Sequence, residues 1–311
     1  MDQMTAPACW VDLSARTLIR VSGEDATTFL QGQLTQDVAA LNGARALWAA
    51  HCSPKGRMLA SFLLWKEGSE FWLDASEDLA EAALRRLRMY VLRSRVVVED
   101  QRGARARFGI CCRPDPGFWD AMGWPPAPAP GTCDRQADVL RVVLSAERLL
   151  LVVPVAQATG LRARLSDLLA AGSSLDWADA AVREGVAEIR AATQDEWVPQ
   201  MINWDLIGGI SFNKGCYTGQ EIVARTHYLG KIKRRMMRYR TRGRPEIGQP
   251  IYGNDPETPV GKVALAGSAS PKAELLAVVH LDALSTGPLH LGQPDGPVLE
   301  SVPLPYTVAT D

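Results

Sequence analysis

The pattern of the sequence changes near Gly230, and this change sets the fold class. Before it, runs with helical spacing alternate with strand-like runs, whereas after it short strand-like runs are separated by turns such as Gly253-Asn254-Asp255-Pro256. A stretch with regular turns and no helical periodicity is typical of a small all-β domain, a barrel or a sandwich. The chain has 311 residues, which is longer than one ordinary core. We therefore predict an α+β protein with a mixed region at 1–228 and a β domain at 229–311.

The mixed region divides into two groups of elements joined by residues 113–131. This connection contains six prolines and three glycines, so we expect it to run over the surface without a helix or a central strand. Ser22-Gly23-Glu24-Asp25 is a helix-capping pattern and predicts a helix from about Glu24. The other predicted elements are strands at 44–52, 57–65, 70–74, 96–98, 139–144 and 149–153, and helices at 76–90, at 156–170 and from Asp176 onward.

Composition narrows the classes of function. The formal net charge is −1 and 47% of the residues are apolar, so we expect a folded core and no global attraction to nucleic acid or membranes. No run approaches the ~20 apolar residues of a membrane helix, and the N-terminus has no export pattern. We therefore expect a cytoplasmic monomer. The six cysteines follow no disulfide or zinc spacing, and there are only four histidines, so we expect no metal site built by the protein.

The segment Lys214-Gly215-Cys216-Tyr217-Thr218-Gly219-Gln220-Glu221 concentrates the reactive side chains. Its last four residues fit a capping box, which predicts a helix with Thr218 as its N-terminal cap. Cys216 would then lie two residues before the cap, where the helix dipole and Lys214 both favour the thiolate. The alternative is that Cys216 is a small packing residue in a glycine-rich turn.

This segment resembles the signature of the YgfZ family, folate-binding relatives of the glycine-cleavage T protein. The resemblance extends to four further blocks: Gly23-Glu24-Asp25-Ala26 with Phe29-Leu30-Gln31-Gly32-Gln33-Leu34-Thr35-Gln36-Asp37-Val38, Ala49-Ala50-His51-Cys52-Ser53-Pro54-Lys55-Gly56-Arg57-Met58, Ile207-Gly208-Gly209-Ile210-Ser211-Phe212 and Pro303-Leu304-Pro305-Tyr306. It implies two α/β subdomains around a central folate cavity, followed by a C-terminal β-barrel. It also implies a tetrahydrofolate-binding accessory protein for the assembly or repair of iron–sulfur clusters, including those of tRNA-modifying enzymes.

Seven residues become candidates for the site. Cys216 and Lys214 are assigned to the chemistry. Trp177 is assigned to folate, because the family has a folate-associated tryptophan at this place, 39 residues before the motif cysteine. The other folate candidates come from the loop and its helix: Tyr217, Gln220, Glu221 and Arg225. The family's second folate-associated tryptophan aligns with Arg16, and Trp10 lies out of register.

A second departure from the resemblance concerns acid–base chemistry. Aminomethyltransferases of this fold carry paired aspartates shortly after a glycine turn, but the matching stretch here is Gly56-Arg57-Met58-Leu59-Ala60-Ser61. A positioned acid or base contributes ~10²–10⁴-fold to a rate, so its absence argues against that reaction. We expect no conventional enzymatic turnover. The alternative is an aminomethyltransferase-like one-carbon transferase that acts with tetrahydrofolate.

Eight of the fourteen residues from 231 to 244 are basic: Lys231, Lys233, Arg234, Arg235, Arg238, Arg240, Arg242 and Arg244. Such a run is typical of a solvated strand whose charges guard an exposed edge. The alternative is a site for the polyglutamate tail of folate or for tRNA phosphates. The expected partners are therefore folate and, transiently, iron–sulfur enzymes or cluster-assembly proteins, with tRNA as a further candidate.

Overall fold

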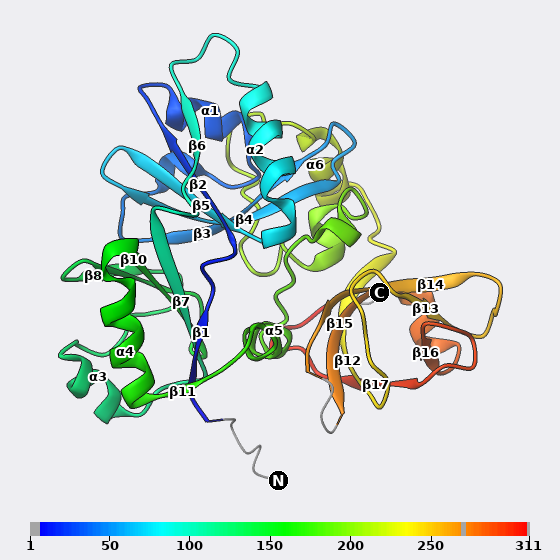
Figure 1. Ribbon diagram of the computed structural model, residues 1–311. Helices are drawn as coiled ribbons and strands as arrows, with labels where there is room; N and C mark the ends of the chain where they lie inside the picture. The colour runs from blue at the N-terminus through cyan, green and yellow to red at the C-terminus, as the bar shows by residue number, and fades with distance from the viewer. Residues whose placement is uncertain (1–6, 269–271, 310–311) are drawn as a thin grey trace. The chain divides into compact units, whose positions relative to one another are not determined.

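The computed structural model describes residues 7–268 and 272–309. The chain divides into two compact units, each assembled from separate segments. Figure 1 colours the chain by residue number and labels its helices and strands. The first unit comprises the chain up to Ala26, Ala40–Leu47 and Leu63–Ala180; the second comprises Thr27–Ala39, Trp48–Phe62 and the chain from Ala181. No helix in these described ranges has both the length and the apolarity needed to cross a membrane.

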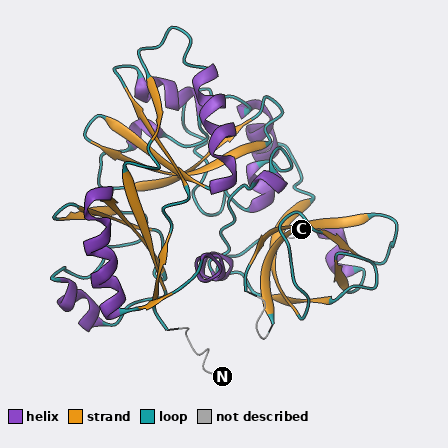
Figure 2. Ribbon diagram, viewed as in Figure 1, coloured by secondary structure: helices purple, strands orange, loops and turns teal. Residues whose placement is uncertain are grey.

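A six-stranded sheet lies at the centre of the first unit, with the strand order β11-β1-β7-β10-β9-β8. Its strands are β1 (Cys9–Asp12), β7 (Arg105–Cys111), β8 (Cys133–Gln136), β9 (Val139–Val143), β10 (Arg148–Pro154) and β11 (Ala170–Ala171), and helices α3 (Pro116–Met122), α4 (Ala158–Leu168) and α5 (Ser174–Arg183) belong with it. Helices α3 and α4 cover one face, where Phe108 and Trp119 share an apolar core (Figure 2). Side chains alternate along a strand, so Gly109 faces the other way, toward Trp177 of α5.

The second sheet has the order β3-β4-β5-β2-β6. Its strands are β2 (Thr17–Ser22), β3 (Ala46–Cys52), β4 (Met58–Glu67), β5 (Glu70–Ala75) and β6 (Val97–Asp100). Helix α2 (Ala80–Met89) belongs to the first unit and buries Leu84 and Leu87, which lie on the face predicted from their spacing. Helix α1 (Ala26–Gln33) begins where the capping pattern of residues 22–25 predicted a helix.

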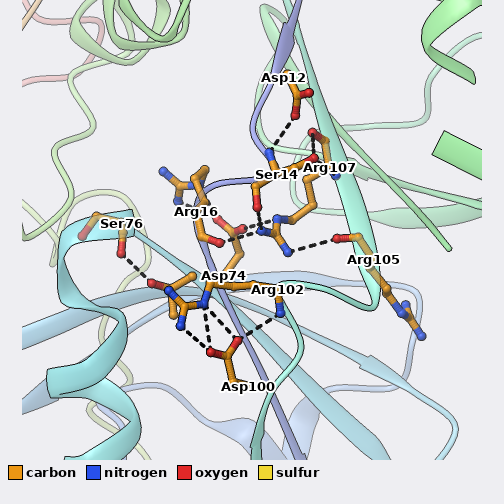
Figure 3. A network of polar contacts seen from close by, with 10 residues as sticks. Asp12, Ser14, Arg16, Asp74, Ser76, Asp100, Arg102, Arg105 and Arg107 are labelled. Atoms are coloured by element: carbon orange, nitrogen blue, oxygen red, sulfur yellow. Dashed lines mark hydrogen bonds and ion pairs between the residues drawn. The ribbon is translucent and has the colours of Figure 1, made fainter. Parts of the chain in front are cut away.

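A buried ion pair joins the two sheets inside the first unit (Figure 3). Arg16 Nε donates to Asp74 Oδ1 at 2.7 Å, and Arg107 Nε lies 3.6 Å from Asp74 Oδ2. The Arg107 guanidinium also donates to the carbonyl oxygens of Ser14 and Arg16 at 2.7 and 2.5 Å. Burial lowers the pKa of Arg107, and Asp74 opposes this effect. Because buried charges are stable only when they are paired, the network fixes the segment between β1 and β2.

The second unit ends in a closed six-stranded barrel with the order β12-β15-β14-β13-β16-β17. Its strands are β12 (Arg234–Thr241), β13 (Pro250–Tyr252), β14 (Pro259–Ala266), β15 (Ala273–His280), β16 (Leu289–Leu291) and β17 (Val298–Val302). Strand β12 pairs with both β15 and β17, which closes the barrel. Ile251, Val263 and Leu275 lie in its apolar interior. The C-terminal β-barrel and the α+β fold class are thereby confirmed.

One expectation about the chain between the predicted elements is wrong. Residues 113–131 contain helix α3, although six prolines and three glycines argued against a helix. Asp115 caps α3 by accepting a hydrogen bond from Phe118 N, and Pro116 occupies the first turn. Proline is tolerated there because that position has no intrahelical donor to lose. Gly123, at a φ of 64°, ends the helix in the left-handed region that favours glycine.

Short 3₁₀ helices complete the secondary structure. They are η1 (Val38–Ala40), η2 (Glu77–Leu79), η3 (Val155–Gln157), η4 (Ala191–Thr193), η5 (Pro199–Ile202) and η6 (Leu281–Ser285). Helix α6 (Gln220–Tyr228) follows the cysteine-bearing loop in the second unit. The loop and the helix provide the frame of the candidate site.

Candidate functional site

Lys214 anchors the cysteine loop within the second unit. Its Nζ donates to the carbonyl oxygens of Gln31, Leu34 and Gln36 at 2.7, 2.6 and 2.8 Å. An ammonium group has three donors, so these carbonyls use all of them. Burial lowers the pKa of Lys214 to about 8, and the nearby Asp37 opposes this effect. The ammonium therefore fastens the loop to the end of α1 and the segment that follows it.

Further hydrogen bonds join the same two segments. Thr35 Oγ1 donates to the carbonyl oxygen of Gly209 at 2.7 Å and accepts from Ala50 N at 2.9 Å. Ser211 N donates to the carbonyl oxygen of Thr35 at 2.9 Å, and Gln36 Nε2 donates to that of Gly208 at 2.5 Å. Thr35 is fully buried, so the bonds of its hydroxyl are shielded from water and hold the start of the loop firmly.

Helix α6 begins differently from the prediction. Its N-terminal cap is Gly219, at a φ of 85°, and no side chain caps the helix, so the predicted Thr218 capping box is wrong. A methyl group added at Gly219 would lie 2.5 Å from the carbonyl oxygen of Ser53 and 3.1 Å from Cys52 Cβ. The turn after β3 packs on this glycine so closely that the chain takes a left-handed conformation there. The helix consequently starts one residue later.

The turn between β3 and β4 contacts α6 as well. Gly56 has a φ of 71°, and a methyl group added to it would lie 2.7 Å from Cβ of Ile222. Three of the segments that carry the family resemblance, near residues 31–36, 52–56 and 208–219, thus meet inside the second unit. Backbone atoms make most of these contacts.

Cys216 lies at the exposed tip of this assembly. It is a free cysteine and is exposed to solvent, as is its neighbour Gly215. The alternative role as a packing residue is therefore wrong. The contrast with Cys52 is clear, because burial raises the pKa of that thiol to about 12 and keeps it protonated. A thiol must be accessible to bind a metal or attack an electrophile, and Cys216 meets that requirement.

The other candidates of the loop and helix differ in exposure. Tyr217 is buried, and its ring lies 5.1 Å from Lys214 Nζ; burial and the nearby Cys52 raise the pKa of its hydroxyl. Gln220 is half-buried, whereas Glu221 and Arg225 are exposed. No ion pair joins Glu221 to Arg225, both of which the structure describes. Those two side chains are free to meet a ligand from solution.

Trp177 belongs to the first unit, whereas the loop belongs to the second. Its indole is 7% exposed, and a methyl group added at Gly109 would lie 2.6 Å from its Cε3. The guanidinium carbon of Arg148 lies 5.1 Å from the ring centroid. Among the described residues, no atom accepts a hydrogen bond from Trp177 Nε1. The indole N–H group is therefore buried and unpaired within the described part of the chain.

The positions that resemble the aspartates of aminomethyltransferases lie on β4 and have structural roles. Ala60 is buried, and Ser61 Oγ accepts a hydrogen bond from Ile189 N at 2.8 Å. A carboxylate is thus absent from both positions. Among the described residues, no group of three histidine, cysteine or acidic side chains is arranged to hold a metal ion.

Most cations of β12 are already paired. Arg235 is buried and makes a bidentate ion pair with Asp205 at 2.7 and 3.0 Å. Arg238 and Arg240 both pair with Glu274 on β15. The sequence carried no sign of these acidic partners, because they are distant along the chain. Among the described residues, five basic side chains of this run are exposed outside such pairs: Lys231, Lys233, Arg234, Arg242 and Arg244. Of these, Arg234 donates a hydrogen bond to His280.

Comparison with solved structures identifies the fold. The glycine cleavage system aminomethyltransferase T from Bartonella henselae matches with a TM-score of 0.78 and 16% sequence identity, over 97% of this chain and 87% of that chain. The heterotetrameric sarcosine oxidase from Corynebacterium sp. U-96 matches with a TM-score of 0.37 and 16% identity, over 53% of this chain and 87% of that chain. No protein-family model matches the sequence. The chain has the fold of the T-type aminomethyltransferase.

Proposed function

We propose that this chain is a YgfZ-type protein: a tetrahydrofolate-binding accessory factor for the assembly or repair of iron–sulfur clusters. The observation that carries the proposal is an exposed Cys216 on a loop that Lys214 fastens through three backbone carbonyls. The fold is that of an aminomethyltransferase, yet Ala60 and Ser61 stand at the positions of the acid. Such a protein keeps the scaffold, has no carboxylate at these two positions and carries an exposed thiol on a different segment, at Cys216.

The candidate residues for folate belong to both units. In the first unit, Trp177 Nε1–H lacks an acceptor among the described residues, and a pterin carries carbonyl and ring-nitrogen acceptors. The glutamate end of folate is acidic, so Arg225 and the exposed cations near Lys231 complement it in charge. Tyr217, Gln220 and Glu221 are the other folate candidates of the second unit. Tetrahydrofolate, when bound, supplies a reduced pterin that carries one-carbon groups.

Cys216 acts in this proposal on a cluster or on a client protein. A thiolate is a soft ligand that favours iron in iron–sulfur sites, and Cys216 is open to solvent. Lys214 positions the loop and makes no contact with the cargo. The partners are iron–sulfur enzymes, including those that modify tRNA, and cluster-assembly proteins, each bound transiently in the cytoplasm.

The test compares two neighbouring variants in cells that lack the protein. Cys216→Ala should fail to restore the activity of cluster-dependent enzymes, because the thiol is gone. Gly215→Ala should restore it, since a methyl group there meets no atom within 4 Å. Both variants should accumulate to the level of the unmodified protein. Full restoration by Cys216→Ala would remove the cysteine from the proposal.

A one-carbon transferase is the second candidate, and the match to an aminomethyltransferase favours it. Purified protein given tetrahydrofolate and an aminomethylated carrier protein should show no turnover, because no carboxylate stands at Ala60 or Ser61. Measured turnover would replace our proposal with this one. The same preparation can be tested for tRNA, whose binding should be weak since Arg235, Arg238 and Arg240 are already paired.

A further inference from the structure

Two thiols outside the cysteine loop face each other in the first unit. Cys9 on β1 is the direct antiparallel partner of Cys111 on β7, and a hydrogen bond joins their side chains. Directly opposite residues of antiparallel strands are about 4.5–5.5 Å apart at Cα. Disulfide bonds span about 4.4–6.8 Å between the same atoms. The backbone therefore holds this pair at a separation that a disulfide can bridge without moving either strand.

The two cysteines differ in access. Cys111 is buried and Cys9 is half-buried. A methyl group added at Gly172, just after β11, would lie 2.8 Å from Cys9 Sγ, so this glycine leaves room beside the sulfur. The hydrogen bond with Cys9, in which the Cys111 thiol is the donor, and burial together raise the pKa of Cys111, which therefore keeps its proton. A small oxidant in solution consequently meets Cys9 first.

We propose that Cys9 and Cys111 form a redox-active pair that undergoes thiol–disulfide exchange with a low-molecular-weight disulfide of the oxidised glutathione class. Cys9, as its thiolate, attacks one glutathione sulfur, which forms a mixed disulfide and releases one glutathione thiolate. The sulfur of Cys111 then attacks Cys9 Sγ, loses its proton to water and releases the second glutathione. The two cysteines lose two electrons and two protons in total, and one oxidised glutathione becomes two reduced molecules.

The cross-link changes the first unit in a measurable way. It closes a loop of about 100 residues, which restricts the unfolded chain strongly. It also fixes β1, whose Trp10 carbonyl accepts a hydrogen bond from Gly172 N at 2.8 Å. We expect the melting temperature to rise by roughly 5 °C on oxidation and to return after reduction. This inference does not depend on folate binding or on Cys216.

The experiment treats the full chain with oxidised glutathione, blocks the remaining thiols with iodoacetamide and analyses the tryptic peptides by mass spectrometry. The expected product is a cross-linked peptide that joins Cys9 to the peptide 108–135, because trypsin does not cleave between Arg113 and Pro114. That peptide contains Cys111, Cys112 and Cys133, so variants assign the bond. Cys112→Ser should keep the cross-link, whereas Cys9→Ser and Cys111→Ser should abolish it. Cys133→Ser is the matched control for loss of another buried cysteine and should keep it.

Three results would overturn the proposal: Cys9 remaining unmodified in the folded protein, Cys9 stopping at the mixed disulfide with glutathione, or a cross-link that disappears in Cys112→Ser. If Cys111→Ser fails to fold, Cys9→Ser and Cys112→Ser still decide the outcome, because Cys9 is half-buried and its loss leaves no large cavity. The melting temperature of Cys9→Ser should not respond to oxidised glutathione.

Discussion

Three glycines in the cysteine loop and the segment before it, Gly208, Gly215 and Gly219, allow backbone strain and packing to be measured separately. A methyl group added at Gly215 or at Gly208 would meet no atom within 4 Å, but Gly208 has a φ of 75°. Gly219 has a φ of 85°, and a methyl group added to it would also lie 2.5 and 3.0 Å from backbone atoms. A left-handed conformation costs an alanine about 1–2 kcal/mol, and overpacking adds about 1–3 kcal/mol. We expect Gly219→Ala to lower the free energy of unfolding by about 2–5 kcal/mol.

The assay is urea denaturation followed by far-ultraviolet circular dichroism, with all three variants and the unmodified protein measured together. Gly208→Ala should lose about 1–2 kcal/mol, and Gly215→Ala should stay within about 0.5 kcal/mol of the unmodified protein. The essential result is the order of the losses in stability, which should be largest for Gly219→Ala, smaller for Gly208→Ala and smallest for Gly215→Ala. If Gly219→Ala were no less stable than Gly208→Ala, the close packing of α6 on the turn after β3 would be refuted.

Three further results follow from the buried polar groups. The pKa of Cys52 is about 12 in the folded protein, against 9.0 for an ordinary cysteine. As the pH rises above 9, the unfolded chain loses this proton while the folded chain keeps it, so the free energy of unfolding falls. Urea titrations at pH 8 and 10 should show about 1.4 kcal/mol of loss in the unmodified protein that is missing in Cys52→Ala. Asp74→Ala should cost about 3–5 kcal/mol, because it leaves Arg107 buried without its carboxylate, and an unchanged urea midpoint would contradict this. Ser61→Ala should lower the free energy of unfolding by about 1–3 kcal/mol, since Ile189 N loses its acceptor. Slower amide exchange at Ile189 in this variant would contradict the prediction.

Local patterns in the sequence predicted those elements whose periodicity is strong. The run at 149–153 forms β10 (Arg148–Pro154), the run at 70–74 forms β5, and the helix predicted at 156–170 appears as η3 followed by α4. The absence of helical periodicity after Gly230 predicted a β domain, because short strands between turns leave few other solutions. These features depend on residues close together in the chain.

The features that the sequence did not reveal depend on distant backbone atoms. Lys214 donates to carbonyls about 180 positions away along the chain, and every residue type carries such a carbonyl. The cap at Gly219 depends on the carbonyl of Ser53, which overrides the local capping preference of Thr218. Helix α3 was missed for a different reason, because proline composition was weighed without the position of Pro116 in the first turn.

The ligand is the central claim, and anaerobic calorimetric titration with tetrahydrofolate tests it most directly. The unmodified protein should bind one equivalent, and Trp177→Phe, which removes the unpaired Nε1 donor, should bind roughly tenfold more weakly. Trp10→Phe is the matched control, because Trp10 also has a buried Nε1 without an acceptor among the described residues. Trp10 lies in the core on the opposite face of the same sheet, so the Trp10→Phe variant should bind tetrahydrofolate as tightly as the unmodified protein. Absence of binding by the unmodified protein, or equal binding by Trp177→Phe, would contradict the account.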